Sequence, residues 1–339
     1  MKRFSLLVLT GVLTAACVQA ADSRAAFLKL IDRPTVPLAA ESNVMFSSNG
    51  LVQIHFSFAS EKDQRVTGIL IKPENSPERR PVVIALHGTG GSKHNMLSLC
   101  RKLAARGFVA VAIDGRYHGE RANGSKGSVA YEHAIVRAWH EGGEHPFFYD
   151  TVWDVMRTVD YLQTREDVDP KRIGLVGISK GGIETYLTAA VDPRIAVAVP
   201  CIGVQSFRWA LDNNLWQGRL GTIPKAFETI TNEAHLTEPD AAFAKNFYDR
   251  VAPGIYSEFD GPALLPLIAP RPLLVINGDS DVRTPLPGLQ QCTDSAQLAY
   301  KNQNAQDHFA IRIQEHTGHQ VRLESERAAI EWFVRWLKP

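Results

Sequence analysis

The sequence lacks an excess of charge of either sign. It has 37 lysines and arginines against 36 aspartates and glutamates, so the formal net charge at pH 7 is +1. A protein that holds a nucleic acid backbone or an anionic membrane surface by electrostatics needs a basic surplus. We therefore expect no nucleic acid partner.

Long apolar segments are scarce as well. Beyond the first twenty residues no stretch has the length and purity of a membrane span, and no internal repeat or low-complexity tract is present. The composition, 45% hydrophobic and 22% charged, is that of an ordinary globular protein. A chain of 339 residues fits either two domains or one α/β sheet with an inserted subdomain.

The amino terminus resembles an export signal. Lys2 and Arg3 precede the apolar stretch Phe4–Leu13, and small residues lead to a cleavage site at Ala20. We predict a signal peptide over residues 1–20 and a periplasmic or secreted product. Attachment of a lipid at Cys17 is the alternative.

Cysteines are few. Cleavage after Ala20 leaves Cys100, Cys201 and Cys292, an odd number that permits at most one internal disulfide in an oxidising compartment. The spacing does not select a pair. Three buried thiols that pack as small apolar groups are an equally good interpretation.

Apolar periodicity predicts a mostly parallel sheet between helices. Polar and apolar residues alternate over Leu51–Ser60, and Arg65–Lys72 continues as a second strand, so this pair is expected to form an antiparallel edge. Later strands are short apolar runs, typical of strands buried on both faces. These runs are Pro81–Leu86, Phe108–Ile113, Ile173–Ile178, Ile195–Val199, Leu273–Ile276 and Phe309–Ile313. The expected helices are Met96–Ala105, Thr151–Gln163, Ile183–Ala190, Leu289–Lys301 and Leu323–Leu337.

Two segments interrupt this alternation of strands and helices. They are Arg116–Tyr149 and a stretch of about sixty residues, Gly203–Pro262. The second is too long for a structureless connection, so we expect a helical cap at about residues 203–262, over the carboxyl edge of the sheet. Trp209 and Trp216 are expected to form the core of this cap.

A candidate nucleophile lies between a strand and a helix. Ser179 is the serine of a G-x-S-x-G motif that follows the strand ending at Ile178. Such a turn strains the serine backbone, and Gly177 and Gly181 allow the strand and the helix to approach closely. The side chain of the next residue, Lys180, is expected to be solvated, and attraction of an anionic substrate is the alternative.

A serine hydroxyl needs a base, and the base needs an acid to orient it. Two loops that leave later strands supply candidates: Asp279 and Asp281 in one, His316 and His319 in the other. The order of serine, acid and histidine along the chain is that of the α/β-hydrolase triad.

Over Pro81–Pro339 the chain resembles the α/β-hydrolase superfamily, nearest the dienelactone-hydrolase-like and prolyl-oligopeptidase-like serine esterases. The motifs that carry the resemblance are His87-Gly88-Thr89-Gly90-Gly91, Asp114-Gly115-Arg116-Tyr117-His118-Gly119, the turn at Ser179, Gly278-x-x-Asp281-x-x-x-Pro285 and Gly318-His319.

The resemblance implies an α/β-hydrolase fold over residues 21–339, with Ser179, Asp281 and His319 as the catalytic residues. In the family the acid follows its glycine by three residues and the base follows a glycine directly. The oxyanion hole would use the backbone amides of Lys180 and Thr89, with Gly90 as the alternative to Thr89. His87 is expected to be structural.

The implied reaction is hydrolysis of carboxylic esters through an acyl-enzyme, on a small-molecule or polysaccharide-linked substrate, without a metal or organic cofactor. His133, His140 and His145, with Glu141 and Glu144, lack a compact metal-ligand spacing. Tyr117 and His118 either line the active-site entrance or make ordinary loop hydrogen bonds. A peptidase or an acyltransferase on the same triad, or a non-catalytic binding protein with a hydrolase fold, are the alternatives. The sequence indicates neither the ester nor the oligomeric state.

Overall fold

A nine-stranded sheet organises the protein, which we describe from a computed structural model of residues 23–74 and 78–339. The predicted signal peptide lies outside the described residues. The strand order is β1-β2-β3-β5-β4-β6-β7-β8-β9. The strands are β1 (Glu41–Ser48), β2 (Leu51–Glu61), β3 (Gln64–Pro73), β4 (Arg80–Leu86), β5 (Val109–Ile113), β6 (Val168–Ile178), β7 (Ile195–Cys201), β8 (Leu273–Gly278) and β9 (Phe309–Gln314).

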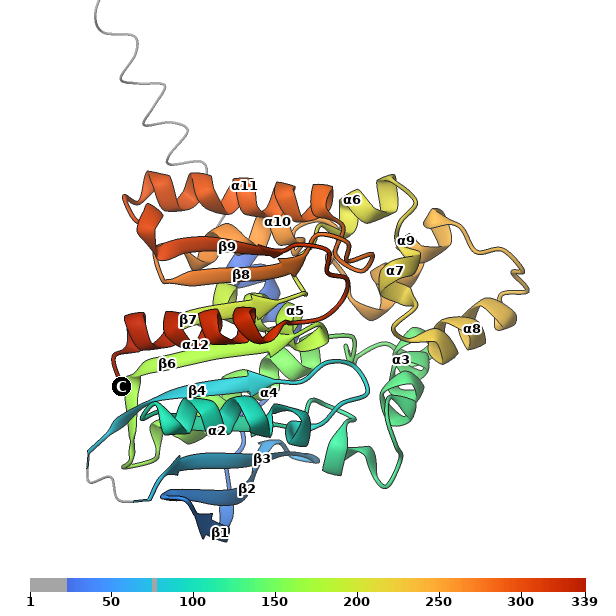
Figure 1. Ribbon diagram of the computed structural model, residues 1–339. Helices are drawn as coiled ribbons and strands as arrows, with labels where there is room; N and C mark the ends of the chain where they lie inside the picture. The colour runs from blue at the N-terminus through green and yellow to red at the C-terminus, as the bar shows by residue number, and fades with distance from the viewer. Residues whose placement is uncertain (1–22, 75–77) are drawn as a thin grey trace, which may run out of the picture.

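The sheet is antiparallel at one side and parallel over the rest. β1, β2, β3 and β5 pair antiparallel in succession, whereas the pairs from β5–β4 through to β8–β9 are parallel. The predicted antiparallel pairing of β2 with β3 is confirmed, but these two strands are not the edge. That place belongs to β1, whose eight residues are all exposed (Figure 1). No face of β1 contacts the core, so its sequence carries no buried alternation from which it could be predicted.

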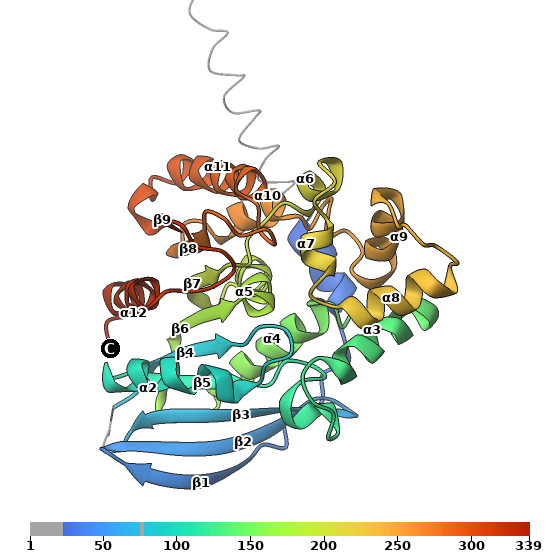
Figure 2. The ribbon, with the colours of Figure 1, turned by 45° about the vertical axis from the view of Figure 1, so that its right-hand side comes forward.

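Helices cover both faces of the parallel region, as predicted. α2 (Leu97–Ala105) and α12 (Leu323–Leu337) lie on one face, and α4 (Tyr149–Gln163), α5 (Lys180–Val191) and α11 (Leu286–Asn302) lie on the other (Figure 2). Alternate residues of each strand therefore enter two separate cores. Along β4, for example, Val82, Ile84 and Leu86 face α4 and α5, and Val83 and Ala85 face α2 and α12.

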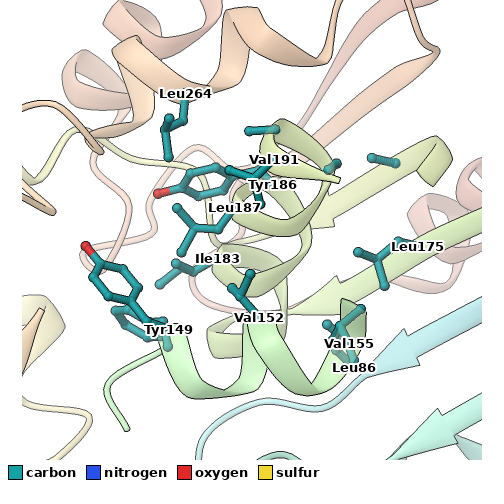
Figure 3. Close-up of a cluster of buried hydrophobic side chains, with 14 of the residues drawn as sticks. Leu86, Tyr149, Val152, Val155, Leu175, Ile183, Tyr186, Leu187, Val191 and Leu264 are labelled. Carbon is teal, nitrogen blue, oxygen red and sulfur yellow. The ribbon is translucent and has the colours of Figure 1, made fainter. Parts of the chain in front are cut away.

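The core between α4, α5 and the sheet supports the strand end that carries Ser179. Val152 and Val155 of α4 and Ile183 and Leu187 of α5 belong to one core cluster with Leu175 of β6, which lies on the sheet side of the two helices (Figure 3). All five side chains are fully buried. Because this packing fixes α5 against β6, the turn between them is held on both sides.

The prediction that every later strand is buried on both faces is wrong for β9. Arg312 and Ile313 are exposed on this strand, Ile313 to 40%. β9 is the last strand of the sheet and pairs only with β8. An apolar run at an edge looks the same in sequence as one at the centre of a sheet.

The two interrupting segments both contribute helices at the carboxyl end of the parallel strands (Figure 1). The first holds α3 (Val129–Glu141), and the second holds α6 (Phe207–Asp212), α7 (Gln217–Leu220), α8 (Pro224–Glu233) and α9 (Ala241–Val251). We call these five helices the cap. Trp216 is buried in the cap with its ring 5.8 Å from that of Phe227, whereas Trp209 is only half-buried.

The remaining helices are short. They are α10 (Gly261–Leu264), η1 (Lys93–Met96), η2 (Gly119–Ala122), η3 (Leu265–Ile268), η4 (Gln306–His308) and a helix over residues 23–31. Within the described ranges no helix has the length and apolarity that crossing a membrane requires.

Cys100, Cys201 and Cys292 are all buried free thiols. Of the two interpretations that the sequence leaves open, the structure therefore shows three unpaired cysteines and no disulfide among them.

Candidate active site

Ser179 occupies a strained turn between β6 and α5. Its backbone has φ 59° and ψ −114°, outside the regions that residues other than glycine ordinarily occupy. A Cβ on Gly177 would lie 2.1 Å from the Gly181 carbonyl oxygen, and one on Gly181 would lie 2.4 Å from that of Leu86. Both positions therefore require glycine, and the serine is presented at the amino terminus of α5.

A hydrogen-bonded chain connects Ser179, His319 and Asp281. His319 Nε2 lies 2.7 Å from Ser179 Oγ, and His319 Nδ1 lies 2.7 Å from Asp281 Oδ2. The three residues come from the loops after β6, β8 and β9, which leave the same edge of the sheet. In the neutral imidazole Nδ1–H donates to the carboxylate and Nε2 accepts from the hydroxyl.

The neighbouring candidates have other contacts. Asp279 accepts hydrogen bonds from the backbone amides of His316 and Thr317, at 2.8 and 3.0 Å. These bonds join the two loops that carry Asp281 and His319. Asp279 therefore ties the loops together, while Asp281 is the carboxylate that reaches the imidazole.

Burial and hydrogen bonding set the charges within this chain. Burial alone would raise the pKa of Asp281, but hydrogen bonds from His319, the Arg283 amide and Thr284 outweigh it, so the pKa is lowered. Burial lowers the pKa of His319, and the bond to Asp281 only partly opposes this. The pair is therefore an ionised carboxylate beside a neutral imidazole at neutral pH, the state that accepts a proton from serine.

The loop after β4 lies directly against Ser179. A Cβ on Gly88 would be 3.4 Å from Ser179 Cβ, and a turn closes where the Gly91 amide donates to the Gly88 carbonyl at 3.1 Å. Gly90 has φ 73° in this turn. Within the described part of the chain neither the Thr89 nor the Gly90 amide has a hydrogen-bond acceptor. Two donors are thus free beside the serine.

Hydrogen bonds of the His87 side chain stabilise this loop. Its Nε2 accepts from the Gly115 amide at 3.0 Å, and its Nδ1 donates to the Gly88 carbonyl at 2.7 Å. Burial, together with the charge of Lys180, lowers the pKa of His87 to about 4. A neutral imidazole with both nitrogens engaged is a structural group.

The expectation of a solvated Lys180 side chain is wrong. Lys180 is fully buried, and its ammonium pairs with Glu184 one turn further along α5. The ammonium also lies 5.4 Å from the centre of the Tyr131 ring. All residues of α5 are buried, so the Lys180 side chain is enclosed by the protein. Its ion pair with Glu184 stabilises the first turn of α5, directly after Ser179.

The motif after β5, residues 114–119, stabilises the neighbouring loops through Asp114. Asp114 accepts from the Lys93 and Glu120 amides and from Thr67 Oγ1, and it pairs with the buried Lys93 ammonium. A Cβ on Gly119 would lie 2.1 Å from the Asp114 carboxylate, so that position admits only glycine. Lys93 could not be singled out from the sequence, because no motif or spacing marks a buried lysine.

Tyr117 and His118 make loop contacts. The Tyr117 hydroxyl donates to the Glu144 carboxylate, at 3.0 and 2.9 Å from its two oxygens. His118 is buried, and its Nδ1 donates to the Arg116 carbonyl at 2.9 Å. The structure thus shows the ordinary hydrogen bonding that was one of the two interpretations.

The remaining histidines do not form a ligand cluster. His140 pairs with Glu233 at 3.1 Å, and the amide of His145 donates to Asp150 at 3.1 Å. Across residues 23–74 and 78–339 no three His, Cys, Asp or Glu side chains are grouped as metal ligands.

The sequence also matches a known protein family. The model of the acetyl xylan esterase (AXE1) family matches residues 39–211, half of the chain. The chain belongs to the acetyl xylan esterase family. It is therefore a carboxylic ester hydrolase, and the predicted membership of the α/β-hydrolase superfamily is confirmed.

Relatives of this esterase agree with that assignment. The Bacillus subtilis (strain 168) protein YtaP is 25% identical over 287 residues, which is 81% of this chain and 84% of YtaP. The 4-O-methyl-glucuronoyl methylesterase 1 of Sodiomyces alcalophilus is 27% identical over 163 residues, 47% of this chain and 31% of that protein. The crystal structure of acetyl xylan esterase 1 from Thermoanaerobacterium sp. JW/SL YS485 has the same fold, with a TM-score of 0.67 at 19% identity, covering 93% of each chain.

Proposed function

We propose that this esterase works through Ser179, His319 and Asp281. The observation that carries the proposal is the position of His319, whose two ring nitrogens lie 2.7 Å from the hydroxyl and 2.7 Å from the carboxylate. His319 takes the proton as Ser179 Oγ attacks the ester carbonyl, then returns it to the leaving alcohol. Water, activated by the same imidazole, releases the acid from the acyl-enzyme. Asp281 holds the imidazole tautomer and stabilises its protonated form.

The oxyanion of each tetrahedral intermediate would be held by backbone amides. Lys180 is the first residue of α5, so its amide has no partner within the helix. The amide of Thr89 is the proposed second donor, with Gly90 as the alternative, because neither amide has an acceptor in the described part of the chain and their loop contacts Ser179. Such preorganised donors stabilise the developing charge without reorganisation.

The proposed substrates are acyl or uronoyl esters attached to plant polysaccharide. Support comes from the family match and from the names of the relatives, which include acetyl xylan and 4-O-methyl-glucuronoyl esterases. Action on a polymer outside the cell agrees with the signal peptide proposed over residues 1–20.

Release of acid from defined esters tests this function. Wild-type protein should liberate acetate from acetylated xylan or the alcohol from a glucuronoyl ester, and Ser179→Ala should lose at least a thousandfold in rate. Ser280→Ala, which removes an exposed hydroxyl bonded to Asp279, is the matched control and should retain activity. Equal rates for Ser179→Ala and wild type would refute the proposed nucleophile.

A further inference from the structure

Arg219 is a buried cation that the proposed mechanism does not use. It lies on α7 of the cap and is only 3% exposed. The helix sits directly on the loop that carries Asp281, because a Cβ on the neighbouring Gly218 would lie 2.3 Å from the Val282 carbonyl oxygen. The guanidinium of Arg219 therefore lies next to the loop that contains Asp281.

Within the described residues Arg219 has no carboxylate partner, and its side chain contacts a backbone carbonyl and a side-chain amide instead. Its Nη2 donates to the Arg283 carbonyl at 3.2 Å and faces Gln205 Oε1 at 3.5 Å. In the orientation of the Gln205 amide that satisfies both of its atoms, the oxygen accepts instead from Arg219 Nε at 3.3 Å. A guanidinium has five N–H groups, so several donors are left for another partner.

A buried guanidinium held only by neutral acceptors is costly. Burial accordingly lowers the pKa of Arg219. Asp281 is the carboxylate whose charge acts most strongly on it, but that carboxylate is engaged by His319, Thr284 and the Arg283 amide. The site therefore carries positive charge without a counter-ion of its own.

The surroundings place this charge within the cap beside the triad. Burial lowers the pKa of His319 and the charge of Arg219 adds to this, whereas burial raises the pKa of three tyrosines on different helices and the charge of Arg219 only partly opposes it. These are Tyr131 of α3, Tyr186 of α5 and Tyr248 of α9. Two of them, Tyr131 and Tyr186, have fully buried hydroxyls with no hydrogen-bond partner among the described residues. Charge and unsatisfied hydroxyls thus converge from several elements.

We propose that Arg219 receives a carboxylate of the substrate, so that this enzyme favours esters whose acyl or alcohol part also bears an acid group. This inference rests on the proposed function, because it assigns a substrate class to the same site. A carboxylate matches the planar fork of a guanidinium and accepts several hydrogen bonds at once. The half-buried Arg283, whose charge also acts on His319, adds to the positive field at this point.

Matched ester pairs test this preference. In 4-nitrophenyl hemisuccinate a carboxylate replaces the terminal methyl of 4-nitrophenyl butyrate, which probes the acyl side. Acetylated xylo-oligosaccharides with and without a glucuronic acid branch probe the alcohol side. We expect wild type to favour the acidic member of at least one pair in kcat/KM. Arg219→Met should reduce that preference about tenfold to a hundredfold, and Arg219→Lys should restore it in part.

Controls separate this inference from the proposed function. Lys245→Met removes an exposed cation of α9 and should leave the preference as in wild type. All assays are run on the alkaline plateau of the rate, so that a change in the pKa of His319 has no effect. Thermal unfolding and labelling of Ser179 by a fluorophosphonate verify that each variant is folded and active.

Two outcomes would overturn the carboxylate site. One is a wild-type enzyme without preference in either pair. The other is an equal loss on acidic and neutral esters in Arg219→Met and Arg219→Lys variants that still label, which would make Arg219 a structural or tuning residue. In both cases the neutral ester would still be hydrolysed, whereas failure of the proposed function would abolish hydrolysis of all esters and labelling of Ser179.

Discussion

Among single residues, His319 is the proposed base, so its environment should set the pH range in which the enzyme works. Burial lowers the pKa of the imidazole below its ordinary value of 6.5, and the charges of Arg219 and Arg283 act in the same direction. The hydrogen bond to Asp281 opposes both effects without cancelling them. His319 is therefore a free base over a wider acidic range than an exposed histidine.

The pH profile follows from this direction. A base with a lowered pKa loses activity only when the pH falls through that lowered value, so the acid limb of kcat/KM should have its midpoint below 6.5. Measuring kcat/KM for a neutral ester between about pH 4 and 9 checks this. A midpoint above 6.5 would contradict the assignment of His319 in its buried environment.

The two aspartates of one loop differ in their contacts, so they should differ in effect. Asp281→Asn keeps the shape but cannot hold the imidazole in the same tautomer, and we expect kcat to fall about a thousandfold to ten-thousandfold. Asp279→Asn keeps an acceptor for only one of the His316 and Thr317 amides, which bond different carboxylate oxygens, but Asp279 does not contact the imidazole, so kcat should fall less than about tenfold. Steady-state kinetics of both variants on one ester measure these losses. A larger loss of kcat in Asp279→Asn than in Asp281→Asn would identify Asp279 as the acid.

At the scale of elements, the turn between β6 and α5 depends on glycine more than on any side chain. Gly181 faces the Leu86 carbonyl of the neighbouring strand so closely that a methyl group has no room. The G-x-S-x-G spacing and the strand before it predicted this turn correctly. The buried Lys180–Glu184 pair beneath it could not be predicted, because the burial of a helix on all sides is decided by its neighbours.

Gly181→Ala tests the close approach of strand and helix. We expect the free energy of unfolding to fall by about 1–3 kcal/mol from overpacking, and kcat to fall as well because the nucleophile is displaced. Urea unfolding and steady-state assays measure the two effects. Gly124→Asn, at a left-handed position with open space around it, is the control and should change little. An unaffected Gly181→Ala would show that the turn tolerates a side chain.

At the scale of the whole molecule, the alternation of apolar strands and amphipathic helices was enough to predict an α/β sheet with a cap. It failed at the two edges, where β1 has no buried face and β9 has only one neighbouring strand. Arg219 shows the same limit within the site. Arg219 is of interest because no carboxylate among the described residues pairs with it, and a sequence does not reveal a missing partner. In addition, a four-residue helix such as α7 is too short for a periodicity that would show which side chains are buried.

The state of the cysteines is a property of the whole fold. Burial raises the pKa of Cys100 and Cys201 to about 12, and Cys292 is buried as well. We expect native protein to resist alkylation at these three positions, and protein unfolded without a reductant to be modified at all of them. Peptide mass mapping checks this. A linked pair among the three in unreduced protein would contradict the structure.

The proposed reaction depends on Ser179 being a nucleophile activated by His319 and Asp281. Labelling with a fluorophosphonate, followed by mass mapping of the modified peptide, tests it most directly. We expect one covalent adduct on Ser179 in wild type, no adduct in Ser179→Ala, and labelling at least a hundredfold slower in His319→Ala. An adduct on another residue, or labelling of wild type no faster than of His319→Ala, would contradict it.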